Sequence, residues 1–164
     1  MTTVQRSVTA LALALGALAV APARQARAAE ISVLVGGGSP SEPWGTLWGG
    51  MLTITLFNIV HGDVEGARQG GALEGTSLYT ASAKAYLGPT FGRIVPYAGI
   101  GAGVYHQSLP VEDDQGTTGL LFVGAKLKFP MGLVLRGEYQ WVDMPDAAPL
   151  PLDNRYFFAV GLSF

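Results

Sequence analysis

The chain has 164 residues, enough for one domain, and its composition is 49% hydrophobic but only 13% charged. A soluble domain usually carries about 25% charged residues, so this chain has unusually little charge with which to keep a surface in water. It contains no cysteine, which excludes both a disulfide framework and a thiolate metal site.

The first segment has the pattern of a secretion signal. Arg6 precedes an apolar run at residues 8–23, and the Ala-Arg-Ala motif at residues 26–28 supplies the small residues that a signal peptidase accepts. The run is shorter than the roughly 20 residues that span a bilayer as a helix. The sequence therefore predicts a signal peptide at residues 1–28 and a mature domain at residues 29–164.

Removal of that segment leaves seven Lys and Arg against twelve Asp and Glu, a formal balance of −5. Proteins that bind nucleic acid need basic surface to neutralise phosphates, so nucleic acid is not an expected partner. The mature part has no apolar stretch of 18 residues. Because only helices and closed barrels satisfy their backbone groups in lipid, its apolar composition predicts a β-barrel.

The first part of the mature chain has the weakest strand pattern. Residues 31–38 and 51–60 each look like a strand. The segment Trp44–Trp48 is too short to span a membrane alone, and we expect it to continue through a bend at Gly49-Gly50. A long external loop is predicted at Gly62–Thr76.

The rest of the chain reads as strands of about ten residues in which apolar residues alternate with polar or small ones. The predicted strands are Leu78–Gly88, Ile94–His106, Gly119–Phe129, Leu133–Val142 and Arg155–Phe164. In the second of these, Gly99, Gly101 and Gly103 share a face with two tyrosines, and we expect the glycines to give bulky neighbours room inside a narrow barrel.

The predicted connections alternate in length. They are short at residues 89–93 and 130–132, and long at residues 107–118 and 143–154. A water-soluble β-sheet also alternates, but its loops have no preferred end, whereas outer-membrane barrels combine short periplasmic turns with longer external loops. The sequence therefore predicts an all-β fold, a transmembrane antiparallel up-and-down β-barrel. Bacterial barrels have even strand numbers, and the mature length suits eight strands.

Three segments resemble the small OmpA-like and opacity-type outer-membrane barrels of Gram-negative bacteria. They are VPYAGIGAGV at residues 95–104, LRGEYQWVD at residues 135–143 and FAVGLSF at residues 158–164. The resemblance implies an outer-membrane protein whose partners are outer-membrane lipid and lipopolysaccharide, periplasmic chaperones and the barrel-assembly machinery. It also implies that this machinery reads the alternating residues of the last strand, namely Tyr156, Phe158, Val160, Leu162 and Phe164.

The polar faces of the predicted strands carry charges that would point into the lumen. They are Lys84, Lys126, Lys128, Arg136, Glu138 and Arg155. Side chains fill the interior of an eight-stranded barrel, and buried charges need partners, so Glu138, the only acid expected on a strand, should pair with these cations. The favoured interpretation is a charged plug that fixes the barrel. The alternative is a narrow, gated, anion-preferring channel for small solutes, since cations outnumber the acid.

The predicted long loops are acidic. Their carboxylates are Asp63, Glu65 and Glu74 in the first loop, Glu112, Asp113 and Asp114 in the second, and Asp143, Asp146 and Asp153 in the third. Divalent ions bridging these loops to lipopolysaccharide phosphates are one interpretation, but the spacing matches no defined calcium loop, so solvated loops are favoured and no metal is predicted. The run Gly99–Gly103 lacks a third glycine at Val104 and a following helix, so no dinucleotide cofactor is expected.

Catalysis is the competing class of function, because lipid A deacylases and omptin-type proteases are also barrels. His61 and His106 are expected near the outer ends of strands, and Ser108 follows His106 at the His-x-Ser spacing of a deacylase. The surrounding pattern is not that of a deacylase, so we predict no enzymatic activity. The expected function is a structural role in envelope integrity together with surface interaction, with an external ligand that the sequence does not identify.

Overall fold

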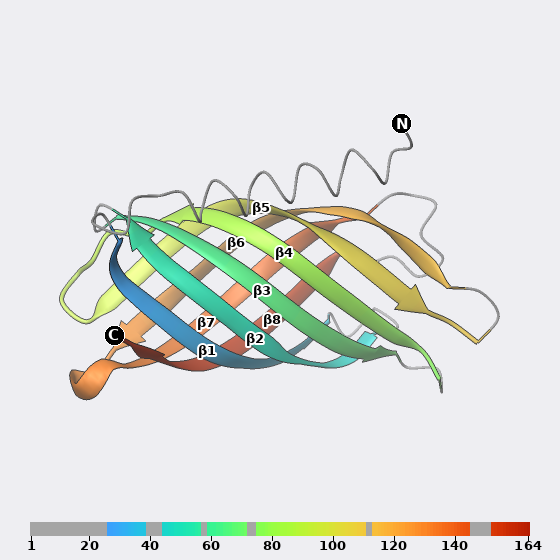
Figure 1. Ribbon diagram of the computed structural model, residues 1–164, viewed down its shortest axis with the longest axis horizontal. Helices are drawn as coiled ribbons and strands as arrows, with labels where there is room; N and C mark the ends of the chain where they lie inside the picture. Colours follow the sequence, from blue (N-terminus) through green and yellow to red (C-terminus); the bar gives the residue numbers. More distant parts are fainter. Residues whose placement is uncertain (1–25, 39–43, 57–58, 72–74, 111–112, 145–151) are drawn as a thin grey trace.

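The computed structural model describes residues 26–38, 44–56, 59–71, 75–110, 113–144 and 152–164, with side chains from residue 28 onward. Eight antiparallel strands pair in chain order, and the last strand returns to the first to close a barrel (Figure 1). The strands are β1 Ala26–Gly38, β2 Trp44–Leu56, β3 Val60–Gly71, β4 Ser77–Leu87, β5 Ile94–Ser108, β6 Asp114–Lys128, β7 Leu133–Asp143 and β8 Asn154–Ser163. The predicted closed barrel of eight antiparallel strands is confirmed. Within the described residues, no helix is both long and apolar enough to cross a membrane.

Strand β2 is continuous from Trp44 to Leu56, and it pairs with β1 on one side and β3 on the other. It includes Gly49 and Gly50 together with most of the segment at 51–60 that was predicted as a strand of its own. The short segment at Trp44 is therefore the beginning of a full-length strand.

The predicted external loop at Gly62–Thr76 is wrong, because most of it forms β3. Asp63 pairs in register with Thr53 on β2 and with Lys84 on β4. This strand places glycine at positions 62, 66 and 70 of its outer face, so it lacks the apolar residue at every second position that marks the predicted strands.

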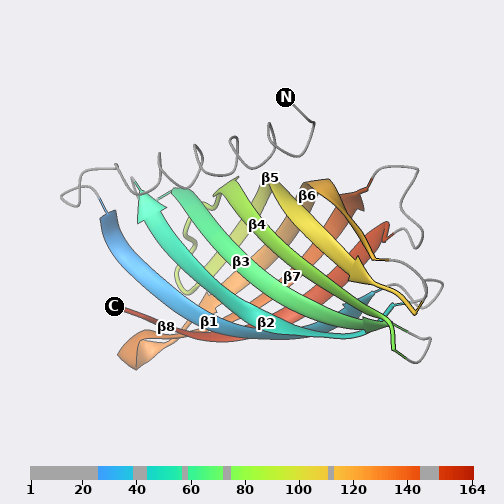
Figure 2. The same cartoon turned by 45° about the vertical axis from the view of Figure 1, so that its right-hand side comes forward.

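The connections gather at two ends of the barrel. The end that carries Ile59, the turn at 88–93 and the 3-10 turn η1, Pro130–Gly132, is called the inner end. The C-terminus lies at the same end (Figure 2). At the opposite, outer end, β1, β3, β5 and β7 finish and β2, β4, β6 and β8 begin. The predicted loop at 107–118 is too long, because β5 and β6 extend into it and leave only residues 109–113.

The two faces of the wall differ in chemistry as the alternation predicts. Large apolar side chains cover the outside, with Val33 70%, Ile100 67% and Phe158 66% exposed, while charged and aromatic side chains fill the inside. The glycines of β5 leave space for bulky side chains of the neighbouring strand inside the barrel, as predicted. A Cβ atom at Gly99 would lie 2.4 Å from Tyr86 Cβ, and one at Gly101 would lie 2.8 Å from Lys84 Cγ.

Candidate functional site

The centre of the lumen holds six charged side chains, which together are called the central cluster. They are Asp63 and Glu65 on β3, Lys84 on β4, Arg136 and Glu138 on β7, and Arg155 on β8. The pleat of each strand turns these positions inward, and each of the six residues is at most 4% exposed. Buried charges are tolerated only when they are paired, so the contacts among them decide what the site does.

Lys84 joins two strands that are not neighbours. Its Nζ atom lies 2.6 Å from Glu65 Oε2 and 2.8 Å from Glu138 Oε1, and Asp63 Oδ2 is 3.9 Å away. The ammonium group also lies 5.1 Å from the ring centroid of Phe122 and 5.2 Å from that of Phe157. Lys84 therefore ties β3, β4 and β7 together across the lumen.

Arg136 forms the second junction of the central cluster. Its Nη2 atom lies 2.7 Å from Asp63 Oδ2, and its guanidinium also donates to Glu138. Tyr97 donates to Glu138 Oε2 at 2.8 Å, and Tyr86 donates to Asp63 Oδ1 at 3.1 Å. Tyr86 thus binds the Asp63 oxygen that Arg136 does not contact, whereas Tyr97 shares Glu138 Oε2 with the guanidinium and also accepts a hydrogen bond from Arg136 Nε.

Arg155 completes the central cluster from β8. Its Nη2 atom lies 2.7 Å from Glu65 Oε1, its Nη1 atom donates to Thr80 Oγ1 at 3.0 Å, and its Nε atom donates to Gln140. The amide nitrogen of Gln140 in turn donates to Glu65 Oε2 at 3.2 Å and to Glu138 Oε1 at 2.5 Å. Every carboxylate of the central cluster therefore contacts at least one cation and one uncharged donor.

A separate ion pair lies nearer the inner end. Lys126 Nζ is 3.0 Å from Glu30 Oε2, and Ser32 donates to the other oxygen of that carboxylate at 3.1 Å. Lys128 follows at the last position of β6, where it is half-buried, and no ion pair among the described residues includes it. Of the predicted lumen charges, the structure brings together Lys84, Arg136, Glu138 and Arg155, gives Lys126 its own partner and leaves Lys128 at the rim.

The expectation that Glu138 is the only strand acid is wrong. Glu30, Asp63 and Glu65 also point into the lumen, so four carboxylates face the four buried cations of the described strands. Sequence reasoning missed Asp63 and Glu65 because β3 was assigned to a loop. A polar pattern could have identified this strand. The polar residues His61, Asp63, Glu65 and Gln69 all lie at odd positions, as the inward residues of one strand must.

Apolar side chains gather inside the barrel toward the outer end. Trp44, Leu78, Tyr105, Leu120, Val142 and Leu152 form one buried cluster, against which Met144 packs. Several of these residues lie in the first or last two positions of their strands, so the cluster lies between the central cluster and the external connections. The described residues contain no group of His, Asp and Glu arranged to hold a metal ion.

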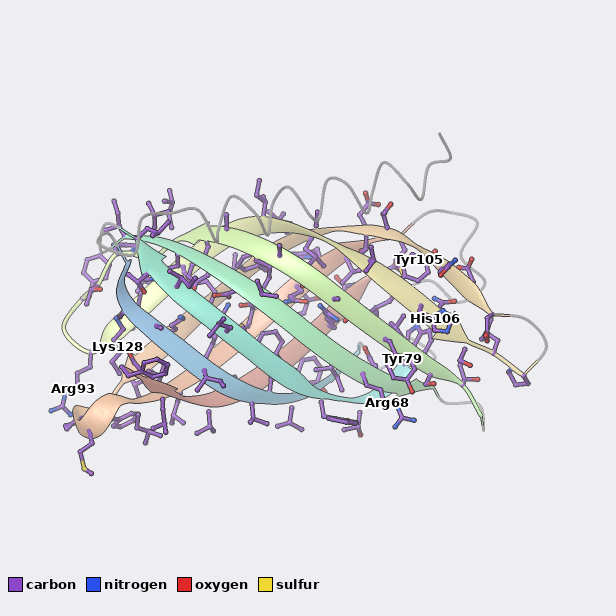
Figure 3. The ribbon with its side chains drawn as sticks, viewed as in Figure 1. Arg68, Tyr79, Arg93, Tyr105, His106 and Lys128 are labelled. Carbon is purple, nitrogen blue, oxygen red and sulfur yellow. The ribbon has the colours of Figure 1, made fainter. Side chains whose placement is uncertain are left out.

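The two histidines lie at opposite ends, which corrects the expectation that both are near outer ends. His61 is buried near the inner end, stacked on Tyr86 at 4.8 Å between ring centroids, with Nδ1 3.0 Å from Thr55 Oγ1. His106 is exposed at the outer end beside Tyr79 (Figure 3). Ser108 donates to Asp113 at 3.1 Å, so its hydroxyl is not directed at the imidazole as a nucleophile's would be.

The acidic residues of the predicted loops separate into three groups. Asp63 and Glu65 are in the lumen, and Asp114 begins β6 and accepts a hydrogen bond from Tyr105. Asp113, Asp143 and Asp153 lie exposed at the outer end. The remaining three, Glu74, Glu112 and Asp146, fall outside the described residues.

The last strand turns the predicted assembly residues outward. Tyr156, Phe158, Val160 and Leu162 are 44 to 66% exposed, and Phe164 just beyond β8 is 77% exposed. Arg155, Phe157 and Ala159 occupy the opposite, lumen face.

A closed barrel with an apolar outer wall and a charged, filled interior satisfies its backbone groups in lipid and exposes no charge to the acyl chains. The fold and the two faces of the wall therefore define the chain as an integral β-barrel of the Gram-negative outer-membrane type.

Solved structures with the same fold support this class. The chain is similar to the N-terminal β-barrel domain of Pseudomonas aeruginosa OprF, with a TM-score of 0.66, 15% identity, and coverage of 85% of this chain and 99% of that one. It is also similar to Neisserial surface protein A, with a TM-score of 0.57, 14% identity and coverage of 83% and 94%. A third similar structure is the Yersinia pestis outer membrane protein Ail in a phospholipid nanodisc, with a TM-score of 0.52, 18% identity and coverage of 82% and 99%. No protein-family model and no curated protein sequence matches the chain.

Proposed function

We propose that this protein is a structural outer-membrane barrel with a closed lumen, which contributes to envelope integrity and presents its acidic outer end to the surroundings. The observation that carries the proposal is the charge balance of the lumen. Among the described residues, four buried cations and four buried carboxylates are bound to one another, and an apolar cluster lies between them and the outer ends of the strands. An ion entering the lumen would have to break these contacts, and the charge balance gives it no preferred sign.

The alternative is a narrow channel for small solutes. The sequence favours a channel only through an excess of lumen cations over the one expected acid. The three additional carboxylates, Glu30, Asp63 and Glu65, remove that excess. We expect the purified wild-type protein to give no single-channel conductance in planar bilayers. The same result is expected of a variant that lacks one partner of the buried network, because the outer apolar cluster remains. Glu138→Gln keeps the shape of the side chain but removes its charge, and Asp113→Asn is the matched change at the exposed outer end.

Conductance in the wild-type protein that changes in Glu138→Gln but not in Asp113→Asn would favour the channel. Absence of conductance in all three proteins supports the closed structural barrel.

Location and processing are tested independently of conductance. We expect the protein to fractionate with outer membranes and to change its electrophoretic migration on heating, since an intact barrel resists detergent until it is heated. We also expect the mature protein to begin at Ala29, as the proposed signal peptide at residues 1–28 requires. A protein found in the soluble fraction, with no heat-modifiable migration, would contradict the proposal.

Two further parts of the proposal concern partners and chemistry. The alternating residues from Tyr156 to Phe164 are proposed as the segment that the barrel-assembly machinery recognises after chaperones deliver the chain, and Phe164→Gln is expected to lower the folded amount in the membrane. Catalysis is not part of the proposed function. The mass spectrum of lipid A should be the same in cells that carry the wild-type protein and in cells that carry His106→Ala; a difference in acyl content would indicate an enzyme.

A further inference from the structure

Five inward side chains form a closed ring in the half of the lumen nearer the inner end, and this group is called the inner ring. On one wall, Thr53 is in register with Glu30 on β1 and with Asp63 on β3, so these three side chains lie next to one another. On the facing wall, Lys126 and Arg136 are in register with each other. Each of the five residues is at most 5% exposed.

Two ion pairs close the inner ring across the lumen. Lys126 Nζ lies 3.0 Å from Glu30 Oε2, and Arg136 Nη2 lies 2.7 Å from Asp63 Oδ2. Both cations also lie over the ring of Tyr86, at 5.4 and 5.2 Å from its centroid. Directly opposed side chains of neighbouring strands have Cβ atoms about 4.5 to 5.5 Å apart, so the fold holds these two like charges side by side.

The inner ring contains hydrogen-bond donors that are not used. Arg136 directs Nε and Nη2 at carboxylates, but its buried Nη1 atom has no hydrogen-bond partner among the described residues. The buried hydroxyl of Thr53 has none there either. Lys126 gives one of the three N–H groups of its ammonium to Glu30. Buried donors cost free energy unless an acceptor meets them, so this arrangement favours a ligand that accepts hydrogen bonds.

Lys128 adds positive charge beside the inner ring. It follows Lys126 by two residues, so alternation turns both side chains to the lumen face of β6. It lies half-buried at the inner end (Figure 3), and no ion pair formed within the described part of the chain includes it. The buried pairs of the inner ring balance each other, so Lys128 leaves this half of the lumen with an excess of positive charge.

We propose that the inner ring binds one chloride ion, which accepts hydrogen bonds from Arg136 Nη1, the Thr53 hydroxyl and the Lys126 ammonium. A water molecule has protons to donate as well, whereas a halide only accepts, as the unused donors require. The ion would reach the ring from the inner end past Lys128 without breaking an ion pair, but passage beyond the ring would still require breaking the contacts of the central cluster. The inference goes beyond the proposed function, since a closed structural barrel does not need a bound anion.

Chlorine NMR of the full chain in a nonionic detergent tests the site, because chloride that exchanges with a protein site gives a broadened line. We expect a broadening that saturates with chloride and is reversed by bromide, but not by the larger anion methanesulfonate at equal ionic strength. Thr53→Val keeps the shape and charges of the inner ring and removes one donor. It should weaken chloride binding about tenfold, as expected for a hydrogen bond to a charged group. Lys128→Gln should weaken binding less, because its charge lies at the half-buried rim.

Matched controls keep the result specific. Ser82→Ala removes another buried hydroxyl that lacks a partner among the described residues, on β4 outside the inner ring, and Arg68→Gln removes an exposed cation at the outer end. Neither should change chloride binding. Broadening that bromide does not reverse, that persists unchanged in Thr53→Val or that falls equally in Ser82→Ala would overturn the proposal. So would the absence of broadening in wild-type protein that still shows heat-modifiable migration. Because the barrel is then intact, this failure is distinguishable from failure of the proposed function.

Discussion

The central cluster and the pair formed by His106 and Asp113 join similar groups in opposite environments. In the cluster, the side chains of Lys84 and Glu65 are 0% exposed and 2.6 Å apart, whereas those of His106 and Asp113 are 47% and 60% exposed and 4.0 Å apart. Water solvates the exposed imidazole and carboxylate whether or not they are in contact, so their contact adds little. Inside the barrel an unpaired charge has no such alternative. Burial, more than the number of ion pairs, should decide which charges hold this barrel together.

The largest expected effect comes from Glu65→Ala. This change removes the carboxylate that binds both Lys84 and Arg155, and it leaves two buried cations with reduced compensation. We expect a loss of about 3 to 5 kcal/mol in the free energy of unfolding. Urea titration in lipid vesicles, followed by tryptophan fluorescence, measures it. Glu65→Gln, which keeps the shape and part of the hydrogen bonding, should lose less. A loss below about 1 kcal/mol in Glu65→Ala would show that water compensates the lumen charges and would remove the contrast with the exposed pair.

Lys126→Met should have an intermediate effect. It breaks the 3.0 Å pair with Glu30, but the Glu30 side chain is 7% exposed and keeps its hydrogen bond from Ser32. We expect a loss of about 2 kcal/mol, in the range for hydrogen bonds to charged groups. The double variant Glu30→Gln/Lys126→Met should recover part of this loss, because it leaves no unpaired charge. A double variant less stable than Lys126→Met by the full cost of Glu30→Gln would indicate that the two groups act independently.

The side chains on the outer face of each strand decide how much of the fold could be predicted from the sequence. Strands β4 to β8 are recognised because apolar residues recur at every second position of their lipid face, as Leu133, Leu135, Tyr139 and Trp141 do on β7. Strand β3 has glycine at three positions of that face, so an apolar period of two is almost absent. Its inward charges then looked like those of a solvated loop.

Pairing inside the lumen was beyond prediction for a different reason. Lys84 and Glu138 are 54 residues apart and come from strands on different parts of the wall. Which inward side chains meet depends on the stagger of all eight strands, and a single strand's pattern does not contain that information. The inward orientation of Lys84, Arg136 and Arg155 followed from alternation, but their partners on β3 required the complete barrel.

Gly101→Ala tests the space that the central cluster needs. A Cβ atom at Gly101 would lie 2.8 Å from Lys84 Cγ and 2.9 Å from Ala83 O, so both the lysine stem and the backbone of β4 must move. We expect a loss on the order of 1 kcal/mol, typical of mild overpacking. Gly66→Ala is the matched control, since nothing lies within 4 Å of a Cβ atom there. Equal stabilities of the two variants in the urea titration would mean that the packing around Lys84 accommodates an additional methyl group without cost.

Asp113→Ala should have the smallest effect and completes the comparison from the exposed side. The change removes the acceptor of the Ser108 hydrogen bond and the partner of His106, yet all of these groups can be solvated. We expect the free energy of unfolding to change by less than about 1 kcal/mol, as for most exposed ion pairs. Two differences in stability are compared here: wild type against Asp113→Ala, and wild type against Glu65→Ala. Added salt should change the first more than the second, because screening acts mainly on exposed charges. If Asp113→Ala instead cost as much as Glu65→Ala, burial could not be the property that separates the two sites, and the outer end would have to contribute to the stability of the barrel in its own right.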